Sequence, residues 1–569
     1  MKKYILSFLV ICIHPSSQLW VNAWKVLQSK NTGWRILHHH MKSQTRQLQQ
    51  QQRRSCCCLP AYVNDYEIPS SSSVSSKSSI PLGVYVHIPY CQRRCRYCDF
   101  AIVPIGSSTS STTTILSTNN NHDNSLQKDG FHRMDERYRQ AVVDEIRWTF
   151  QHNQPPNRPI SSIYFGGGTP SLAPLETIRT ILQEIRSHTI TLDDLEITME
   201  MDPGTLDESM LRDLAALGIN RISLGVQTLN DNVLEYIGRV HRLVDIENAM
   251  TIIQKVYGCN PNMTFDDNTT TNPEGPNVSM DLISGLPGVS LADWADVLER
   301  TVHHFKPSHI SIYDLQIEKN TVFGKWYSQY DEDATTIPYN TQSSLSLMND
   351  QISSNGGHPQ QQYNVSRYRL PSPDDSAYMY RYASGYLRSE GYEHYEISSY
   401  ARPGKRSRHN QVYWGYDTEW YAFGLGSTSF WNQTRLARPR AMADYLDWVQ
   451  QQKVQTTTIN TINHNHTIPP QESTLNMDVS SWKQERLTDI LLTRLRTSDG
   501  LDLHWVQTMY GDETIQCIFR GIQLAIELDL VTIEKDDSKL LWLLRFKDPL
   551  GFLFSNTILS NIFVELSED

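Results

Sequence analysis

The run Gly83-Val-Tyr-Val-His-Ile88 leads through Pro89 into Cys91-Gln-Arg-Arg-Cys95-Arg-Tyr-Cys98, and this stretch decides the fold. Apolar residues alternate in its first part, which predicts a β-strand, and the proline ends that strand. Three thiols then follow within eight residues. Three cysteines on a loop directly after a strand are typical of a soft metal or an iron–sulfur cluster.

Two kinds of metal site fit this cysteine loop. Zinc sites usually combine one cysteine pair with a second pair or with two histidines, but the later residues Cys259 and Cys517 stand alone. His87 lies four residues before the first thiol of the loop, so the spacing by itself leaves zinc open. A four-iron cluster with three cysteine ligands keeps one iron open for a small molecule that binds through an amine and a carboxylate. We therefore expect the three thiols of the loop to hold a [4Fe–4S] cluster.

Strands and helices alternate after the cysteine loop. The predicted strands are Ile163–Phe165, Leu195–Met199, Arg221–Val226, Val278–Ile283 and Ser308–Tyr313. The predicted helices are 134–150, Leu175–Ser187, Asp207–Leu217, Asn230–Gly238 and Leu291–Phe305. This alternation indicates βαβ units with a parallel sheet. About six such units predict an α/β fold, a partial (β/α)6 barrel, with its functional residues at the carboxyl ends of the strands.

Polar stretches interrupt this pattern. We expect disordered insertions near 104–130, 256–277 and 330–374. The barrel domain is then predicted at 82–440, and a further linker or insertion at 441–480. Beyond it, clustered leucines and the run Leu540–Leu544 predict a small, mostly helical C-terminal domain at 481–569.

The amino-terminal residues 1–64 differ from the rest in charge. They carry nine bases, and the first acid of the chain is Asp65. A basic, acid-free composition predicts an organelle-targeting leader, followed by a linker at 65–81. An apolar run behind two lysines at the start favours a plastid leader, whereas a start at Met41 favours a mitochondrial presequence. Both organelles stay open, with a cytoplasmic location as the fallback. Cys56–Cys58 lie in the leader and are expected to be removed with it.

Charge and composition argue against several classes of protein. The 569 residues include 51 Lys+Arg and 62 Asp+Glu, a net charge of -11, which is unusual for a protein that grips nucleic acid. No apolar run is long enough to predict a transmembrane helix. Nine cysteines in a chain of this length do not indicate a disulfide scaffold.

Five motifs, in this order, resemble one protein family. They are YVHIPYCQRRCRYCDF at 85–100, YFGGGTPSL at 164–172, GINRISLGVQTLNDNVLEYIGRVH at 218–241, DLISGLPG at 281–288, and YEISSYARPG with RHNQVYW at 395–414. Together they resemble the coproporphyrinogen III oxidase-like branch of the radical S-adenosylmethionine (SAM) superfamily, and within it the HemW-type heme chaperones. The resemblance covers about 82–565 and implies a [4Fe–4S] cluster with SAM on its open iron.

Glycines and polar residues stand where these motifs end a predicted strand. Gly166–Gly168 follow Phe165, where glycines let a ligand approach the backbone, although a tight turn would need them as well. Glu200 and Gln227 end the next two strands, so they are expected at one edge of the sheet, although a polar cap is an alternative for each. The resemblance implies cofactor contacts for Tyr85, Tyr97, Gly167, Gly168, Thr169, Glu200, Gln227, Arg239 and Asp281.

Two places bear on heme. Asp99-Phe100 follows the last cysteine of the loop, where the coproporphyrinogen dehydrogenases of this branch carry a further cysteine. His409 begins the run His409-Asn-Gln-Val-Tyr-Trp414, which matches the HNxxYW pattern of the chaperones. From the residues alone, a structural histidine in a turn is the better interpretation of His409. The resemblance implies instead that it is an axial heme ligand.

The resemblance leaves two functions to compare. The first is a chaperone that binds heme and delivers it to client hemoproteins, with an electron donor that serves the cluster. The second is an oxygen-independent coproporphyrinogen III oxidase, which decarboxylates two propionates. Phe100, in place of the further cysteine, favours the chaperone. A radical enzyme that modifies nucleic acids would need basic surface or additional domains, which the sequence does not indicate.

Overall fold

The computed structural model describes residues 82–106, 121–152, 158–258, 276–327, 368–416, 419–431, 434–462, 479–536 and 541–567. The predicted leader and linker at 1–81, and most of each predicted insertion, lie outside these residues. The chain divides into two units. One comprises Ser78–Leu315 and Tyr363–Asp569, and it holds the elements discussed below. The other comprises Met1–Lys77 and Gln316–Gln362, and its described part contains the short helix α9 (Val322–Tyr327).

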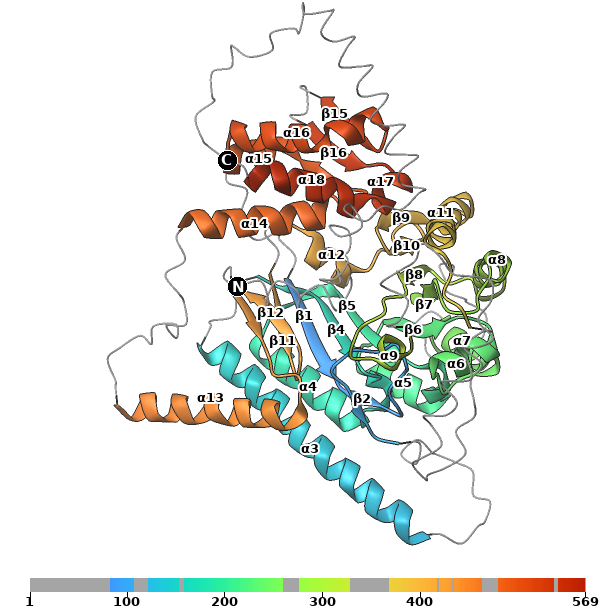
Figure 1. The fold of residues 1–569 in the computed structure, drawn as a ribbon. Coiled ribbons are helices and arrows are strands. Elements are labelled where there is room, and N and C mark those ends of the chain that lie inside the picture. The colour runs from blue at the N-terminus through green and yellow to red at the C-terminus, as the bar shows by residue number, and fades with distance from the viewer. Residues whose placement is uncertain are drawn as a thin grey trace, which may run out of the picture. The chain divides into compact units, whose positions relative to one another are not determined.

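The larger unit is built on one mixed sheet (Figure 1), which has eleven strands within the described residues, in the order β13-β12-β11-β1-β4-β5-β6-β7-β8-β10-β9. The strands from β11 to β8 in this order run parallel to their neighbours. They are β1 (Leu82–Ile88), β4 (Ile160–Gly167), β5 (Thr191–Met201), β6 (Arg221–Gln227), β7 (Val278–Ser284), β8 (His309–Asp314) and β11 (Glu419–Phe423). This confirms the predicted α/β fold with a parallel sheet.

Antiparallel strands extend the sheet at both edges. One edge carries β12 (Thr428–Trp431) and β13 (Thr434–Ala437), and the other carries β10 (Ser399–Ala401) and β9 (Glu393–Glu396). Among the described strands, the two outermost ones are not paired with each other, so the sheet is open, as a partial barrel requires. Every residue of β1 is buried, because a parallel strand in the middle of a sheet is covered on both faces.

The helices described between the parallel strands β4 and β8 are α4 (Leu175–His188), α5 (Glu208–Ala216), α6 (Asp231–Ile237), α7 (Leu243–Tyr257) and α8 (Leu291–Arg300). Four of these five helices begin close to the predicted positions, and the remaining one, α7, was not predicted. Side chains of Asp207, Asn230 and Ser290 accept hydrogen bonds from the first turns of α5, α6 and α8, which fixes where these helices start. The predicted helix Leu291–Phe305 ends as a π-helical turn, η6 (Thr301–Phe305).

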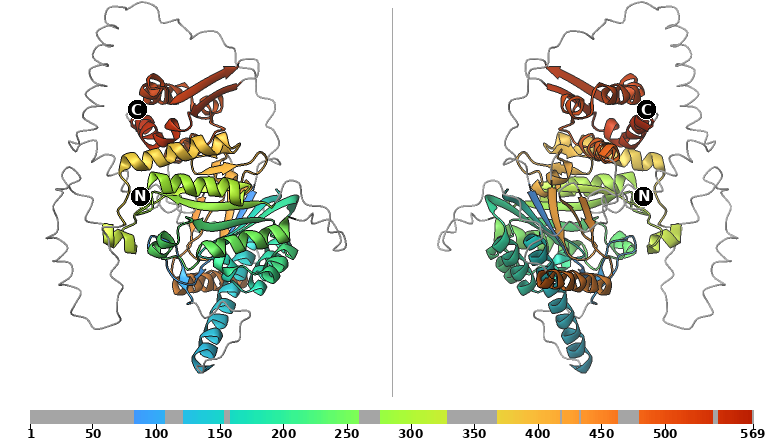
Figure 2. Two further views of the ribbon diagram at one scale, coloured as in Figure 1. Left: turned by 90° about the vertical axis from the view of Figure 1, so that its right-hand side faces the viewer. Right: turned by 90° about the vertical axis from the view of Figure 1, so that its left-hand side faces the viewer.

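Helix α3 (Asn121–His152) is longer than predicted (Figure 2). The expected disordered insertion at 104–130 was therefore wrong for 121–130, because a polar composition by itself does not separate a helix from a loop. The helix supports the chain that precedes the cysteines. Tyr138 donates a hydrogen bond to the carbonyl oxygen of His87 at 2.7 Å, and Tyr90 donates one to Asp135 at 3.0 Å.

Two other predicted insertions are also shorter than expected. Helix α13 (Met442–Ile462) and helix α14 (Val479–Arg494) occupy both ends of the region predicted as a linker at 441–480. Helix α11 (Pro373–Ser389) begins inside the insertion predicted to end at 374. Ser372 caps α11 by accepting a hydrogen bond from the Asp375 amide, a local start signal that the composition of the region obscured.

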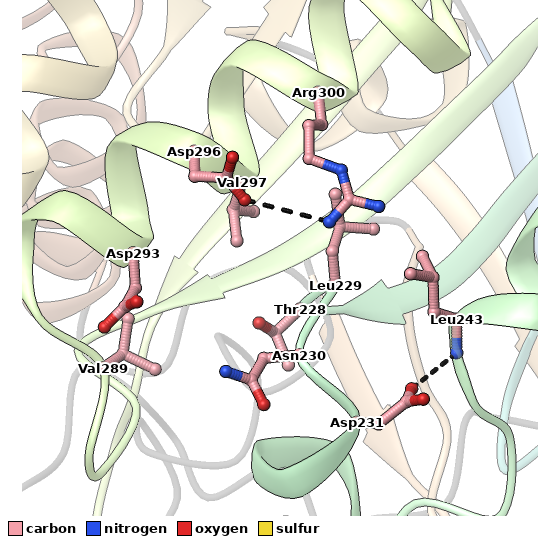
Figure 3. Close-up of a pocket in the computed structure, with 10 residues that line it drawn as sticks. All are labelled: Thr228, Leu229, Asn230, Asp231, Leu243, Val289, Asp293, Asp296, Val297 and Arg300. Carbon is pink, nitrogen blue, oxygen red and sulfur yellow. Dashed lines mark hydrogen bonds and ion pairs between the residues drawn. The ribbon is translucent and has the colours of Figure 1, made fainter.

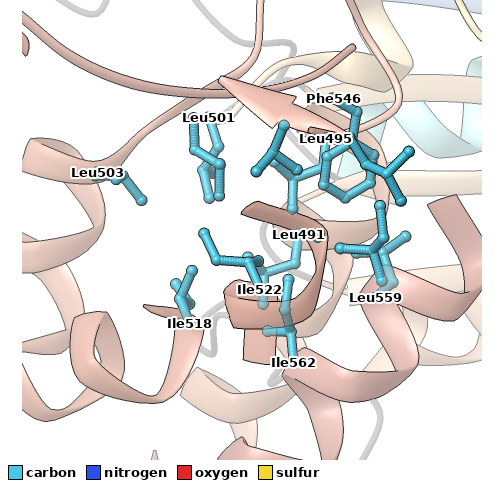
Figure 4. Close-up of a cluster of buried hydrophobic side chains, with 14 of the residues drawn as sticks. Leu491, Leu495, Leu501, Leu503, Ile518, Ile522, Phe546, Leu559 and Ile562 are labelled. Atoms are coloured by element: carbon cyan, nitrogen blue, oxygen red, sulfur yellow. The ribbon is translucent and has the colours of Figure 1, made fainter. Parts of the chain in front are cut away.

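The C-terminal part packs around a hydrophobic cluster (Figure 4), which also takes in Tyr380 of α11 and includes Leu491, Leu495, Ile518, Ile522 and Ile562. It is built from α14, α15 (Leu503–Tyr510), α16 (Asp512–Glu527), α17 (Leu550–Leu553) and α18 (Ser555–Ser567). A three-stranded antiparallel sheet joins them, in the order β14 (Leu501–Asp502), β16 (Leu541–Phe546) and β15 (Val531–Asp536). The part is mostly helical, as predicted, and the exact domain boundary stays a prediction. Among the described helices, none is both long and apolar enough to cross a membrane.

Candidate functional site

The cysteine loop lies at the carboxyl end of β1 and is closed by a short pair of strands. Strands β2 (Tyr90–Cys91) and β3 (Val103–Pro104) run parallel to each other. The Val103 amide donates to the carbonyl oxygen of Pro89 at 2.7 Å, and the Ile105 amide donates to that of Cys91 at 2.8 Å. The three cysteines are therefore held on a loop whose two ends are joined at its base.

Arginines fasten this loop to the end of helix α6. Arg93 Nε donates to the carbonyl oxygen of Gly238 at 2.9 Å, and the amide of Arg96 donates to that of Ile237 at 3.0 Å. Gly238 has a φ of 87°, and a Cβ there would lie 3.3 Å from the Arg96 nitrogen. Arg94 Nη1 donates to the carbonyl oxygen of Phe100 at 3.0 Å. Arginine side chains and backbone groups thus hold the loop in place, and these contacts do not use its thiols.

The three thiols are half-buried, and two of them lie beside polar side chains of neighbouring loops. Cys91 Sγ lies 3.6 Å from Thr169 Oγ1, and Cys95 Sγ accepts a hydrogen bond from Arg239 Nη1 at 3.7 Å. Burial raises the pKa of the Cys91 thiol to about 12 and that of Cys98 to about 11. Thiols of this kind are neutral at pH 7, so a metal or cluster that binds them must displace their protons.

His87 does not complete a metal site with these thiols. Its Nδ1 lies 3.2 Å from the hydroxyl of Tyr85, and its Nε2 lies 2.8 Å from the carbonyl oxygen of Ala101. Burial lowers the pKa of His87 to about 4, which keeps the ring neutral. Both ring nitrogens are therefore engaged in this conformation, which argues against the alternative in which His87 is a zinc ligand. Among the described residues, no three His, Cys, Asp or Glu side chains lie close enough to hold a single metal ion.

The glycine loop after β4 packs directly on the start of the cysteine loop. The amides of Gly168 and Thr169 donate to the carbonyl oxygens of Ile88 and Tyr90, at 2.8 and 2.6 Å. A Cβ on Gly168 would lie 2.6 Å from the Tyr90 oxygen. Gly167 has a φ of 116°, and a Cβ there would lie 2.5 Å from the ring of His87. These glycines are required for close packing of the two loops, in agreement with the tight-turn interpretation.

Glu200, at the end of β5, receives two hydrogen bonds from β4. The Gly167 amide and the Tyr164 hydroxyl each donate to its carboxyl group at 2.9 Å. Burial raises the pKa of Glu200 to about 7, against the effect of these hydrogen bonds and with some help from the charge of Asp281. Near neutral pH this side chain can therefore either donate a proton or bind a cationic amine.

Arg239 is oriented by residues that the sequence analysis did not select. Its Nη2 donates to Asp202 Oδ2 at 2.6 Å and to the carbonyl oxygen of Gly225 at 2.9 Å. His241 Nδ1 lies 3.1 Å from the other carboxyl oxygen of Asp202. Burial by itself would raise the pKa of Asp202, but the charges of Arg239 and His241 outweigh it and lower that pKa to about 2. Asp202 is the first residue after β5 and lies two residues from Glu200. A second acid at this strand end was the signal in the sequence that could have identified it.

Gln227 adopts a backbone conformation that is rare outside glycine, with a φ of 68° at the end of β6. The register between β6 and β7 shifts between Leu224 and Gln227. A Cβ on Gly225 would lie 3.0 Å from the Gln227 side chain and 3.1 Å from that of Arg239. Backbone strain of this kind is found at functional sites, so the structure supports the prediction that Gln227 serves the site.

The remaining predicted contacts lie inside the barrel or under the loop. Asp281 accepts hydrogen bonds from Ser223 at 2.7 Å and from Ser279 at 3.0 Å, and burial raises its pKa. Tyr85 is buried and stacks on Tyr164, with ring centroids 6.1 Å apart. Burial raises the pKa of Tyr97, which interacts with Arg239.

Most of the predicted cofactor residues thus gather on the cysteine loop and around the carboxyl ends of β4, β5 and β6. Tyr85 and Asp281 lie midway along β1 and β7, and the remaining predicted residue, His409, lies elsewhere. That residue lies on helix α12 (Arg408–Trp414), beside the opposite ends of the parallel strands. Its Nδ1 lies 3.0 Å from Ser162 Oγ, near the start of β4, and its Nε2 lies 2.9 Å from the Tyr413 hydroxyl. Its ring stacks on Tyr164 with centroids 5.0 Å apart.

His409 is buried, which lowers its pKa to about 3. Neither of its nitrogens is open to an iron in this conformation, because each already has a hydrogen-bond partner. The structure therefore supports the structural interpretation of His409 rather than the axial-ligand interpretation.

A pocket of about 280 Å³ lies beyond Gln227, between the start of α6 and helix α8 (Figure 3). It is lined by Thr228, Leu229, Asn230, Asp231, Leu243, Val289, Asp293, Asp296, Val297 and Arg300. Several of its polar groups are engaged in local contacts: Asp231 accepts from the Leu243 amide at 2.7 Å, and Asp296 lies 3.8 Å from Arg300. None of the predicted site residues lines this pocket.

Comparison with known proteins gives the family. The radical SAM superfamily model matches residues 85–301. The heme chaperone HemW of Synechocystis is 32% identical over 501 residues, which cover 86% of this chain and 98% of that protein. The chain belongs to the HemW family.

More distant relatives agree with this membership. The mouse protein named radical S-adenosyl methionine domain-containing protein 1, mitochondrial, is 27% identical over 61% of this chain and 59% of its own length. Among solved structures, coproporphyrinogen III oxidase (HemN) from Escherichia coli matches 85% of this chain and 90% of its own, with a TM-score of 0.55 and 18% identity. That likeness shows that this HemW-family chain shares the fold of HemN.

The radical SAM family model implies a [4Fe–4S] cluster and SAM in this HemW-family chain. The residues fit both groups. Three half-buried thiols on a fastened loop can ligate the cluster, and the half-buried guanidinium of Arg239 beside Cys95 can offset its negative charge. The carboxyl group of Glu200, next to the Gly167 amide, is suited to an amine.

Proposed function

We propose that this HemW-family chain is a heme chaperone, which binds heme and transfers it to hemoproteins. The observation that carries the proposal is the match to the Synechocystis heme chaperone along almost the whole of that protein. A shared barrel would support only the fold, because members of one fold perform different chemistry. A match over 98% of the length of a heme chaperone supports a shared function as well.

The residues after the last cysteine of the loop support this choice over a coproporphyrinogen oxidase. Arg94 binds the carbonyl oxygen of Phe100 at 3.0 Å, and Arg440 lies 3.5 Å from the Asp99 carboxylate. The side chain of Phe100 is exposed, and it stands where the oxidase branch carries a cysteine. The structure thus holds Asp99 and Phe100 in place as parts of the loop.

The cluster and SAM have a supporting role in this proposal. A bound cluster would pass one electron to SAM, and an external donor would have to supply that electron. The protein holds the cluster through Cys91, Cys95 and Cys98, and it orients SAM through Glu200, Gln227, Arg239 and Asp281.

The test is anaerobic reconstitution of the purified protein, followed by two assays on the same sample. Heme titration should give a saturable Soret band at one heme per chain. Incubation with coproporphyrinogen III, SAM and reductant should give no protoporphyrinogen above the signal of a Cys98→Ala variant. Conversion of coproporphyrinogen above that control would overturn the proposal in favour of the oxidase, and so would the absence of saturable heme binding.

We also propose that the protein is imported into an organelle. The support is the basic, acid-free composition of residues 1–64, which is typical of a targeting leader. The name of the mouse relative places that protein in mitochondria, which supports an organelle for this chain as well.

A further inference from the structure

Helix α11 presents a row of tyrosines on its outer face, formed by Tyr378, Tyr382 and Tyr386. Adjacent rings are stacked, with centroids 6.2 and 5.9 Å apart and interplanar angles of 17° and 4°. The spacing of four residues puts the three rings on one face of the helix. Tyr378 is 45% exposed, and Tyr382 and Tyr386 are half-buried. Contiguous aromatic side chains at a surface are a common feature of interaction sites.

A histidine stands at one end of this tyrosine row. His303 lies on the π-helical turn η6, a backbone form that often marks functional sites. Its Nε2 is 3.2 Å from the hydroxyl of Tyr386 and 3.9 Å from a carboxylate oxygen of Glu390. Its Nδ1 makes no hydrogen bond within the described residues, and 57% of its side chain is exposed. Histidine and tyrosine are both known as axial ligands of heme iron.

A glycine lies between the tyrosines on the same face. Gly385 is an exposed residue in the body of α11, where glycine costs about 1 kcal/mol relative to alanine. A Cβ at this position would meet no atom within 4 Å, so packing does not explain the glycine. Its φ is not positive, so the backbone conformation does not require it either. The absence of a side chain at Gly385 leaves open space on the helix surface beside Tyr382.

The other end of the row carries a cation. The guanidinium of Arg381 lies 6.0 Å from the ring centroid of Tyr378 and is exposed to solvent. A cation at this place can pair with a carboxylate of a ligand that lies along the row.

We propose that His303, the tyrosine row, Gly385 and Arg381 form a surface site for heme. This inference rests on the proposed chaperone function and names the place where that function binds its cargo. An open imidazole nitrogen binds the iron, the aromatic row and the space above Gly385 accept the flat macrocycle, and Arg381 pairs with a propionate. A surface site with a single histidine suits a protein that must release heme to a client. The buried His409, with both nitrogens engaged, has none of these properties.

The experiment compares three variants of the reconstituted full-length protein by heme titration, absorption spectra and thermal unfolding. His303→Ala should shift the Soret band and weaken heme binding by about ten-fold or more, equivalent to ~1.4 kcal/mol. Gly385→Gln should raise the melting temperature, because it removes a helix glycine, and should still weaken heme binding. A loss of affinity in a more stable protein cannot come from misfolding.

The matched control is His304→Ala, which removes the neighbouring exposed histidine that packs against Phe305, with ring centroids 4.7 Å apart. It should leave the heme spectrum and affinity unchanged. If the wild type binds heme and both His303→Ala and Gly385→Gln keep its spectrum and affinity, the surface site is wrong while the chaperone function stands. If the wild type fails to bind heme at all, the proposed function itself fails.

Discussion

The guanidinium of Arg239 lies against the thiol of Cys95, with Nη1 3.7 Å from Sγ. The same guanidinium is fixed by the carboxylate of Asp202 at 2.6 Å, so it cannot turn away from the cysteine loop without breaking an ion pair. A fixed cation that donates to a cluster ligand favours the more negative, reduced state of the cluster. Arg239 is therefore placed to set the reduction potential of the cluster as well as to contact SAM.

Substitution of this arginine tests that role. Arg239→Gln should lower the midpoint potential of the reconstituted cluster, because the added electron loses a nearby positive charge. The measurement is a redox titration followed by electron paramagnetic resonance. Arg212→Gln, which removes an exposed arginine paired with Glu208 on α5, is the control and should leave the potential unchanged. Equal potentials for the wild type and Arg239→Gln would refute the assignment.

We predict that loss of any one of the three cysteines of the loop removes the whole cluster. Cys91→Ala, Cys95→Ala and Cys98→Ala should each abolish the broad iron–sulfur absorbance, because two thiolates cannot hold a four-iron cluster. Cys517→Ala should keep it, since that residue is buried in the C-terminal part. Iron and labile sulfide assays check both results. Stoichiometric zinc in anaerobically purified wild-type protein would contradict the cluster.

Glu200 predicts that SAM binding depends on pH. Its pKa of about 7 means that the carboxyl group is largely protonated below pH 7 before SAM binds. The ammonium group of SAM favours the carboxylate, so binding should release protons and the affinity should rise from pH 5.5 to about 8. Calorimetry in buffers with different ionisation enthalpies measures the release, which Glu200→Gln should remove. Affinity that stays constant over this range would rule out Glu200 as the partner of the amine.

The raised pKa of Glu200 also affects stability. The folded protein holds this proton more tightly than the unfolded chain, whose glutamate pKa is about 4.3. Its contribution to folding is therefore fully present below pH 4.3 and is lost as the pH rises through about 7.

We predict that His409 contributes to the stability of the fold and does not ligate heme. His409→Ala would leave Ser162 and Tyr413 without their buried partner and would open a cavity, at a cost of about 2–4 kcal/mol. Chemical denaturation should show this loss, while the Soret position of bound heme stays as in the wild type. His504→Ala, at an exposed histidine on α15, should leave stability unchanged. A changed Soret band with unchanged stability would restore His409 as a heme ligand.

The leader yields a prediction that needs no purified protein. Residues 1–64 fused to a fluorescent reporter should enter an organelle, because the segment is basic and has no acid. A fusion in which Arg53 and Arg54 are both replaced by Glu should enter less efficiently. Microscopy with plastid and mitochondrial markers decides between the two destinations. Diffuse cytosolic fluorescence of the unchanged fusion would argue against import.

Much of the fold could be predicted because its signals are local. The buried run that became β1 and the caps at Asp207, Asn230 and Ser290 fixed the elements near their predicted positions. Strand β11 was missed, since a short strand whose partner lies hundreds of residues away leaves no periodic pattern of its own. The extension of α3 was missed because the sequence of its first turns is mostly polar and lacks the apolar spacing that reveals a helix.

The residues of the candidate site also divide into those that the sequence reveals and those that only the folded chain reveals. The cysteines and Glu200 could be found because thiol spacing and a carboxylate at a strand end have chemical meaning in the sequence. Asp202 and His241 act through Arg239, and their role depends on side-chain positions that only the folded chain sets. For His409, the residues alone indicated a structural histidine, whereas the family resemblance indicated a heme ligand. The hydrogen bonds to Ser162 and Tyr413 favour the structural interpretation.

The pairing of β1 with β11 has a consequence for biosynthesis. Leu82 lies opposite Glu419, so one edge of β1 stays open until more than three hundred further residues have left the ribosome. Contacts of such long sequence separation form slowly and late. The strand that leads into the cysteine loop is therefore paired on both edges only when synthesis has passed residue 423, and we expect the iron–sulfur cluster to be inserted after that point.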